Sequence, residues 1–286
     1  MGKQFPRKEI IKNLQEKIAR GVPIIGCGAG TGISAKFEEA GGADLMIIYN
    51  SGRYRMAGRS SLSGLFAYGD ANAIVVEMGN EVLPVVKNTP VLAGVNGTDP
   101  FRLMPVFLKQ LVEMGFSGVQ NFPTVGLFDG VMRENMEATG LGYDLEVELI
   151  RTAHQMDIFT SPYVFNVDEA RAMTEAGADL LVPHVGLTTA GTIGAANALT
   201  LDDAIDKVMS MADAAWKTNP DLMVICHGGP FDEPDNVGIA LEKMPGIIGI
   251  YRASSAERQQ TKRAKKGQEE AYKALKLAPK KAECET

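Results

Sequence analysis

Two of the three histidines in the chain end or follow short apolar runs, where a side chain can reach a substrate. The run at residues 222–226 is followed by His227, and the run at 180–184 ends in His184. Apolar runs bounded by glycines or polar residues are typical of strands buried on both faces of a parallel sheet. A histidine at the end of such a strand can transfer protons. We therefore consider His227 and His184 candidate catalytic residues; the alternative is that each only holds a loop carbonyl.

Other polar or aromatic side chains occupy the same position at the ends of predicted strands. They are Asn50, Asn96, Gln120, Asn121, Tyr163, Tyr251 and Arg252. If the strands are parallel and close into a barrel, their carboxyl ends meet on one rim, where barrel enzymes carry out their chemistry. On that reading the Asn and Gln side chains orient a bound substrate.

The segment after the second predicted strand combines amide, hydroxyl and guanidinium groups. It contains Asn50, Ser51, Arg53 and Arg55 among glycines. Arginine binds carboxylates and phosphates through paired hydrogen bonds, so we expect these four residues to bind an anionic substrate, although a solvated loop is the alternative. Glu77 lies among apolar residues of the next predicted helix. We expect it either to be paired in the core or to reach the site as a further catalytic group.

The loops after the seventh and eighth predicted strands could hold an anion. In barrels of this kind these two loops often bind phosphate through backbone N–H groups and a helix N-terminus. Here they supply Gly228 and Gly229 in one loop, and Ser254 and Ser255 in the other. Ser254 and Glu257 also have the spacing of a capping box, which is compatible with anion binding because a cap uses only some of the N–H groups.

Eight apolar runs, each followed by a helical pattern, predict a single-domain α/β protein with a (β/α)8 TIM barrel. The predicted strands cover residues 22–27, 44–49, 90–95, 117–121, 158–164, 180–184, 222–226 and 247–251. We expect an N-terminal helix within residues 1–20, the barrel over 21–258 and a C-terminal helical tail over 259–286. Asp99 and Pro100 predict the start of the third barrel helix. The longest connections follow strands two, four and six, on the candidate rim.

Composition and motifs exclude several classes of function. The formal net charge of −6 argues against a general nucleic-acid binder, and no apolar run approaches the length of a membrane span. The three cysteines have no disulfide or metal spacing, which is typical of reduced thiols in the cytoplasm. The glycines between residues 26 and 32 do not form GxGxxG, and GxxxxGK[ST] does not occur, so we expect no nicotinamide or nucleotide cofactor. No carboxylate pair has the diagnostic spacing of a Mg2+ site, so the sequence alone leaves open whether the protein binds Mg2+.

Several sequence blocks, in this order, resemble the phosphoenolpyruvate hydrolase-like or TIM-barrel signal-transduction family. The blocks cover residues 50–58, 68–72, 93–101, 118–126, 184–189, 226–230 and 253–258. The resemblance extends over about residues 7–260 and implies a barrel of the phosphoenolpyruvate mutase and isocitrate lyase superfamily. Arg252 departs from the glycine expected before Ala-Ser-Ser. The acidic Mg2+ cluster and the Lys-Lys-Cys-Gly-His loop of better-known members of the superfamily do not occur.

These observations lead to two hypotheses. The first is a hydrolase or lyase acting on a small anionic 2-oxo or enolpyruvyl acid, such as phosphoenolpyruvate or phosphonopyruvate. The second is a non-catalytic sensor whose barrel binds a small anionic metabolite. Members of the superfamily often exchange their last helix between subunits, so the resemblance also implies a homo-oligomer.

Overall fold

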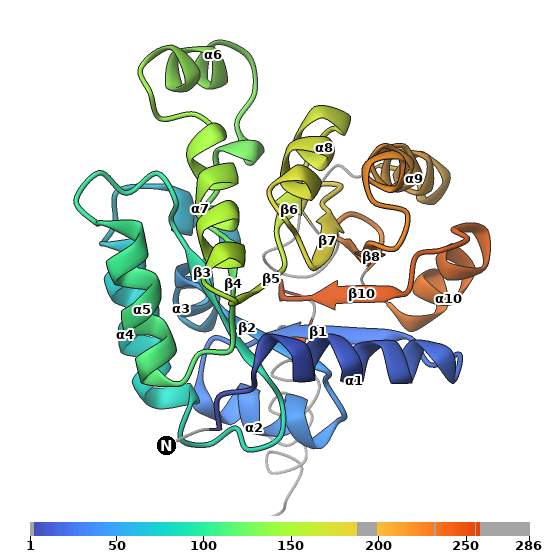
Figure 1. Ribbon diagram of the computed structural model, residues 1–286, viewed down its shortest axis with the longest axis horizontal. Coiled ribbons are helices and arrows are strands. Elements are labelled where there is room, and N and C mark those ends of the chain that lie inside the picture. The colour runs from blue at the N-terminus through green and yellow to red at the C-terminus, as the bar shows by residue number, and fades with distance from the viewer. Residues whose placement is uncertain (1–2, 188–198, 232, 255, 258–286) are drawn as a thin grey trace, which may run out of the picture.

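The computed structural model describes residues 3–187, 199–231, 233–254 and 256–257, and its core is a barrel of parallel strands (Figure 1). The strands are β1 (Ile24–Gly28), β2 (Leu45–Ile48), β3 (Val91–Val95), β4 (Gly118–Asn121), β5 (Phe159–Thr160), β6 (Tyr163–Val164), β7 (Leu180–Pro183), β8 (Met223–Val224), β9 (Cys226–His227) and β10 (Gly249–Arg252). β5 and β6 share one barrel position, and so do β8 and β9. The ten strands therefore fill eight positions, as the sequence predicts.

The strand pairing runs in chain order around the barrel. Seven strands pair in the order β5-β4-β3-β2-β1-β10-β9, and three pair in the order β6-β7-β8. A bridge between His184 and His227 joins the two sheets on one side. On the other, the N–H of Ser161 donates to the carbonyl of Val119 and that of Val182 to Pro162. Each strand thus meets its neighbour through the backbone, and the carboxyl ends share one rim.

Helices surround the strands. They are α1 (Arg7–Ala19), α2 (Gly32–Ala40), α3 (Asn50–Met56), α4 (Ala71–Val82), α5 (Met104–Met114), α6 (Gly130–Ala138), α7 (Asp144–Gln155), α8 (Val167–Glu175), α9 (Leu201–Thr218) and α10 (Pro234–Lys243), with short 3-10 helices η1 (Ser61–Leu65) and η2 (Val125–Leu127). Several begin at side-chain caps: Asp70 accepts from the N–H of Ala73, and Asn166 accepts from that of Glu169. None of the described helices is long and apolar enough to cross a membrane.

The predicted start of the third barrel helix is wrong. Helix α5 begins at Met104 instead of Pro100. Asp99 accepts hydrogen bonds from the N–H of Phe101 and from the side chains of Asn72 and Arg102. Because its carboxylate holds the loop together, the chain stays non-helical for four more residues.

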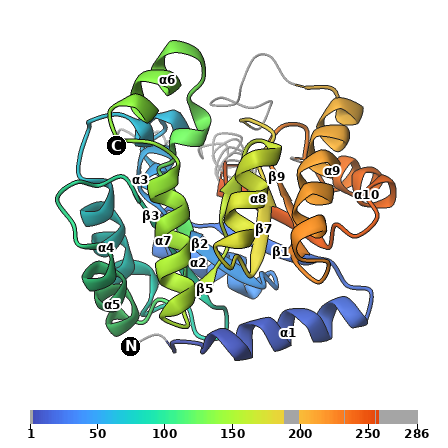
Figure 2. The same ribbon diagram turned by 45° about the horizontal axis from the view of Figure 1, so that its top comes forward.

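Helix α1 lies along the end of the barrel opposite α6, as both views show (Figures 1 and 2). The guanidinium of Arg7 donates to both carboxylate oxygens of Asp179 and to Asp157. The N–H of Phe5 donates to the hydroxyl of Ser117, next to the start of β4. The predicted N-terminal helix is therefore present and is fixed to the amino end of the barrel. The predicted tail at 259–286 lies outside the described residues.

Candidate active site

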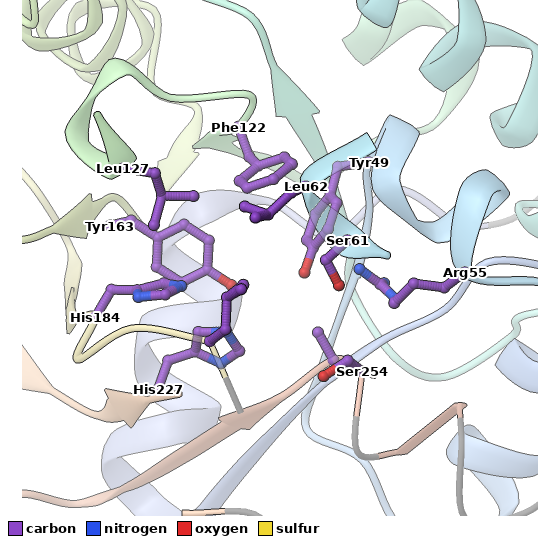
Figure 3. Close-up of a pocket in the computed structure, with 12 residues that line it drawn as sticks. Tyr49, Arg55, Ser61, Leu62, Phe122, Leu127, Tyr163, His184, His227 and Ser254 are labelled. Carbon is purple, nitrogen blue, oxygen red and sulfur yellow. The ribbon is translucent and has the colours of Figure 1, made fainter. Parts of the chain in front are cut away.

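A small pocket lies at the carboxyl ends of the strands (Figure 3). Its walls come from many barrel positions: Tyr49, Arg55, Ser61, Leu62, Phe122, Leu127, Tyr163, His184, Leu187, His227, Ala253 and Ser254. The hydroxyls of Tyr49 and Tyr163 point into the same space. The pocket encloses about 30 Å³, room for about one or two water molecules. Leu62 of η1, Leu127 of η2 and Leu187 after β7 are the leucines among its lining residues, and a ligand larger than the pocket must displace some of the lining side chains.

The two candidate histidines meet in this pocket. The centroids of the His184 and His227 rings are 4.7 Å apart, and the Tyr163 ring lies 5.1 Å from each. They meet because β7 and β9 are neighbouring strands that both end at the rim. The structure places His184 and His227 side by side in this pocket, and their catalytic role stays a prediction.

Backbone groups fix the two rings in opposite tautomers. Nδ1 of His227 lies 2.9 Å from the carbonyl oxygen of Tyr251. A carbonyl only accepts, so this nitrogen carries the hydrogen and Nε2 keeps its lone pair. In His184 the roles are reversed, because Nδ1 accepts the N–H of Gly186 at 3.0 Å. A neutral His184 ring therefore carries its hydrogen on Nε2, and the pocket holds one proton acceptor and one proton donor.

Both histidines stay neutral at physiological pH. Burial lowers the pKa of His227 to about 4, although the hydrogen bond to Tyr251 opposes the shift. Burial also lowers the pKa of His184 well below its usual value, and the neighbouring His227 adds to the shift. Neutral imidazoles can accept or donate a proton without first losing one to solvent.

Arg55 is the cation of the pocket. It lies in α3, and its side chain and that of Glu257 are each 2% exposed. Nε of Arg55 donates to Glu257, and the guanidinium carbon lies 5.1 Å from the centroid of the Tyr49 ring. Burial lowers the pKa of Arg55, but Glu257 and Tyr49, through their charges and hydrogen bonds, together raise it by more, so the guanidinium stays charged. The expectation that Arg55 belongs to the site agrees with its position, and its role in binding stays a prediction.

Sequence analysis missed the buried carboxyl of Glu38, on α2. Glu38 is 5% exposed, and neither carboxyl oxygen has a hydrogen-bond partner among the described residues. Burial raises its pKa to about 8, and the nearby charge of Glu257 adds to this, against the charges of Arg55 and Arg252. At neutral pH this carboxyl is mostly protonated. A lone Glu in an amphipathic helix gives no sign of such a position.

Four of the predicted substrate-binding side chains support the rim from within. Nδ2 of Asn50 donates to the carbonyl of Gly64 at 2.8 Å, and the hydroxyl of Ser51 to that of Ser61 at 2.6 Å. Nε2 of Gln120 donates to the carbonyl of Ser161 at 2.9 Å. None of these side chains lines the pocket; they hold the loops that do.

Asn121, the fourth, is held by Glu146, a buried residue of α7 that the sequence did not single out. Nδ2 of Asn121 donates to Glu146 at 2.6 Å, and Oδ1 accepts the N–H of Tyr163 at 2.7 Å. Glu146 also accepts from the hydroxyl of Thr124 and the N–H of Val125. Burial raises the pKa of Glu146 to about 8, although these hydrogen bonds lower it. Asn121 and Glu146 together fix Tyr163 against the two histidines.

Three predicted site residues lie away from the pocket. The side chain of Glu77 is 67% exposed and pairs with Arg53, which is 39% exposed, at 3.3 Å. The expectation that Glu77 is buried or reaches the site is therefore wrong, because this face of α4 points to solvent. Arg53 also faces solvent. It lies two residues before the buried Arg55, and two residues turn a helix by about 200°, so the two side chains point in nearly opposite directions. Asn96 lines a separate cavity of about 430 Å³ between η1 and the loops after β3 and β4.

The sequence predicts that the loops after the seventh and eighth predicted strands bind an anion, and the structure shows where Gly228, Gly229 and Ser254 of these loops lie. The N–H of Gly229 donates to the carbonyl of Gly186 at 3.1 Å and is not free for a ligand. Gly228 has a φ of 91° and lies so close to Gly186 that a Cβ would stand 2.1 Å from its carbonyl oxygen, which explains the glycine. Ser254 lines the pocket. Ser255 lies outside the described residues.

The part of the rim that the structure describes does not offer the ligands of a typical Mg2+ site. Mg2+ binds through carboxylates and prefers octahedral oxygen ligands. At the ends of β2, β3 and β4 the chain places amides, and Asp99 pairs with Arg102 at 2.9 Å. Among the described residues, His, Cys, Asp and Glu form no group of three that could hold a metal ion.

Comparisons with known proteins agree with this architecture. A family model for phosphoenolpyruvate hydrolase-like proteins matches residues 9–275. The ToMV susceptible protein tm-1(GCR26) of Solanum lycopersicum is 58% identical over 268 residues, which cover 94% of this chain and 36% of that protein. The chain thus spans about a third of the length of this relative.

Two solved structures show the same fold. One is 2,3-dimethylmalate lyase, a member of the PEP mutase/isocitrate lyase superfamily, with a TM-score of 0.57 and 16% identity over 98% of this chain and 91% of that one. The other is phosphonopyruvate hydrolase in complex with oxalate and Mg2+, with a TM-score of 0.58 and 15% identity over 92% and 87%. Because the family model matches nearly the whole sequence, the chain belongs to the phosphoenolpyruvate hydrolase-like family.

Proposed function

We propose that the chain is an enzyme that cleaves a bond beside the carbonyl group of a small 2-oxo acid by hydrolase or lyase chemistry. The observation that carries this proposal is the His184–His227 pair, whose complementary tautomers are fixed by backbone groups at the rim of a barrel. Hydrolases and lyases among the proteins of similar fold support the class of reaction.

In the hydrolytic form, Nε2 of His227 takes a proton from a water molecule as the water oxygen bonds to the carbonyl carbon. Nε2–H of His184 donates to the carbonyl oxygen, where negative charge develops. The neighbouring carbon–carbon bond then breaks, its electron pair stays with the leaving carbon, and that carbon takes the proton from His227. In the lyase form the same base removes the proton of a substrate hydroxyl. The walls from Phe122 and the three leucines exclude further water.

Arg55 binds the substrate carboxylate in this proposal. Its Nε is used by Glu257, and its outer nitrogens remain on the pocket side of the pair (Figure 3). The hydroxyls of Tyr49 and Tyr163 lie in the same space and orient the carboxylate relative to the histidines.

Mg2+ has weaker support than the histidine pair. A protein of similar fold was solved with Mg2+, whereas the rim of this chain offers mainly amide oxygens. In the proposed reaction this chain's own residues therefore carry out each proton transfer. Turnover measured with added Mg2+ and with EDTA tests this choice.

The test of the proposed function is replacement of His227. A thermal-shift screen with 2-oxo acids first identifies ligands, and turnover of each ligand is then measured. The His227→Asn variant is expected to lose roughly 100-fold in kcat, because it lacks the proton acceptor. The matched control is His154→Asn, which changes the third histidine, on α7 beside Arg7 and outside the pocket. Turnover by His227→Asn equal to that of the control would exclude His227 as the base.

A metabolite-binding protein without turnover is the second candidate. The small volume of the pocket, about 30 Å³, favours it, because side chains that must move to admit a ligand also slow its exchange. Binding of a 2-oxo acid without any product formation would support this candidate over the enzyme. The homo-oligomer implied by the family resemblance is also a proposal, and light scattering measures it directly.

A further inference from the structure

We infer that the chain has a second ligand site, which binds a small organic amine with an aromatic body. The site is the cavity of about 430 Å³ between η1 and the loops after β3 and β4. Its volume is within the range of small-molecule sites. The residues that line it are different from those that line the histidine pocket, so the inference does not depend on the proposed function.

Buried side chains hold two walls of this cavity in place. Asn72 is 1% exposed; its Oδ1 accepts the N–H of Asn96 at 2.9 Å, and its Nδ2 donates to the carbonyl of Asn96 at 3.2 Å. On the other wall, Glu146 accepts from the hydroxyl of Thr124 and from the N–H of Val125, both at 2.7 Å. Because these walls are fixed before a ligand arrives, little of the binding free energy is lost in ordering them.

Aromatic side chains at this cavity are exposed to water. Phe101 is 94% exposed and Phe66 is 56% exposed, although both line the cavity. The centroid of the Phe66 ring lies 6.2 Å from that of the Tyr68 ring, which packs against it. Phe128 and Met136, which are partly buried, add further apolar surface to the lining. Exposed apolar surface around a cavity marks a binding site, and an aromatic ligand would cover it with favourable ring contacts.

Two carboxylates in the lining favour a positively charged ligand. Asp70 and Asp99 both line the cavity, and Arg102 pairs with them at 2.7 Å and 2.9 Å. One guanidinium balances one carboxylate, so this group of three side chains keeps one negative charge. The side chain of Asp70 is 53% exposed, and its carboxylate can accept further hydrogen bonds. An ammonium group beside Asp70 would gain this attraction, and it would also be attracted by the faces of the phenylalanine rings.

The experiment compares three ligands that share a phenyl ring on a two-carbon chain and differ in charge: 2-phenylethylamine, 2-phenylethanol and 3-phenylpropionate. Each is titrated at pH 7 into the full chain with ¹³C-labelled methionine methyl groups. NMR follows the signal of Met136, which lines the cavity, and that of Met211, buried on α9 on the other side of the barrel (Figure 1). We expect the amine to shift the Met136 signal without shifting that of Met211. The amine should bind roughly 5-fold more tightly than the alcohol, and the acid most weakly.

Two variants, each with a matched control, test the ring contacts and the charge separately. Phe101→Ala should weaken binding of the amine roughly 3-fold or more, whereas Leu103→Ala, which changes an exposed side chain outside the lining, should not. Asp70→Asn removes the charge and keeps a side chain that caps α4 well. It should abolish the preference for the amine over the alcohol. Asp168→Asn, which changes an exposed carboxylate in the first turn of α8, should leave the preference unchanged.

Several results would overturn the inference. If none of the three ligands shifts the Met136 signal, the cavity is not a site for compounds of this kind. Equal binding of the amine and the alcohol, or tighter binding of the acid, would exclude an amine as the ligand class. An amine preference that survives Asp70→Asn would also exclude the proposed role of this carboxylate. Turnover enters none of these measurements, so failure of the amine site and failure of the proposed function are distinguishable.

Discussion

Replacement of Glu38 by glutamine tests the buried charges behind the site without requiring a known substrate. Glu38 is 5% exposed and lacks hydrogen-bond partners among the described residues. Its pKa is raised to about 8 in the folded chain by burial first and then by Glu257. Glutamine has nearly the same shape and never ionises, so it mimics the protonated carboxyl.

The size of the effect follows from proton linkage. A carboxyl whose pKa is raised on folding contributes its full stabilisation of the folded state at pH values below the unfolded pKa. This stabilisation is lost as the pH rises to the folded pKa. Between about pH 4.5 and pH 8 the unfolded chain is ionised at Glu38 and the folded chain is protonated. The free energy of unfolding then falls by about 1.4 kcal/mol for each pH unit, on the order of 5 kcal/mol in total.

The assay is urea unfolding followed by circular dichroism at pH 5, 6, 7, 8 and 9. Glu38→Gln is expected to lose much less stability than the wild type between pH 5 and pH 8, so its advantage grows with pH. The neighbouring Glu39→Gln variant is the matched control. Three backbone N–H groups lower the pKa of Glu39 against its burial, so its contribution is lost toward acid pH, with the opposite sign. Parallel pH curves for Glu38→Gln and the wild type would refute the reasoning.

Three further predictions concern the site and its supports. Glu146→Ala should lower the free energy of unfolding by about 3 kcal/mol in urea titrations, because it leaves the buried donors around Asn121 without an acceptor; an effect below about 1 kcal/mol contradicts this. If His227 is the base, kcat/KM should stay constant from pH 7 to about 5 and fall with an acid limb near its lowered pKa of about 4, and a limb near 6.5 contradicts the assignment. Leu127→Ala, compared with Leu127→Met, should widen the pocket and raise the association rate of a 2-oxo acid found by the thermal-shift screen in stopped-flow measurements, and equal rates show that Leu127 does not limit entry.

The fold and the histidine pair could be predicted because both follow from chain-local patterns. Apolar runs bounded by glycines gave the eight barrel positions, and parallel strands necessarily deliver their carboxyl ends to one rim. His184 and His227 each end such a run, and their meeting needed no knowledge of loop geometry. Two barrel positions are each divided into two short strands, β5 with β6 and β8 with β9, and no sequence pattern predicts these divisions. The backbone groups of Ser161 and Ile225, which lie between the short strands, still bond to the neighbouring strands.

Other parts of the site depend on contacts between distant segments. Arg53 and Arg55 look equivalent in sequence, but one faces solvent and the other is buried, since two residues turn a helix by about 200°. The partner of Arg55 is Glu257, two hundred positions along the chain. Glu38 and Glu146 resemble ordinary helical carboxylates, and only the packing of α2 and α7 on the barrel shows that they are buried.

The clamp that Arg7 forms with Asp179 and Asp157 has a practical consequence. It secures the first helix at the amino end of the barrel, on the far side from the histidines. A sensor chip or resin coupled through the first residues would therefore hold the molecule with its mouth facing the flowing solution. Ligand injections over such a surface would meet the carboxyl end of the barrel first, whereas random coupling through surface lysines would orient many molecules the wrong way.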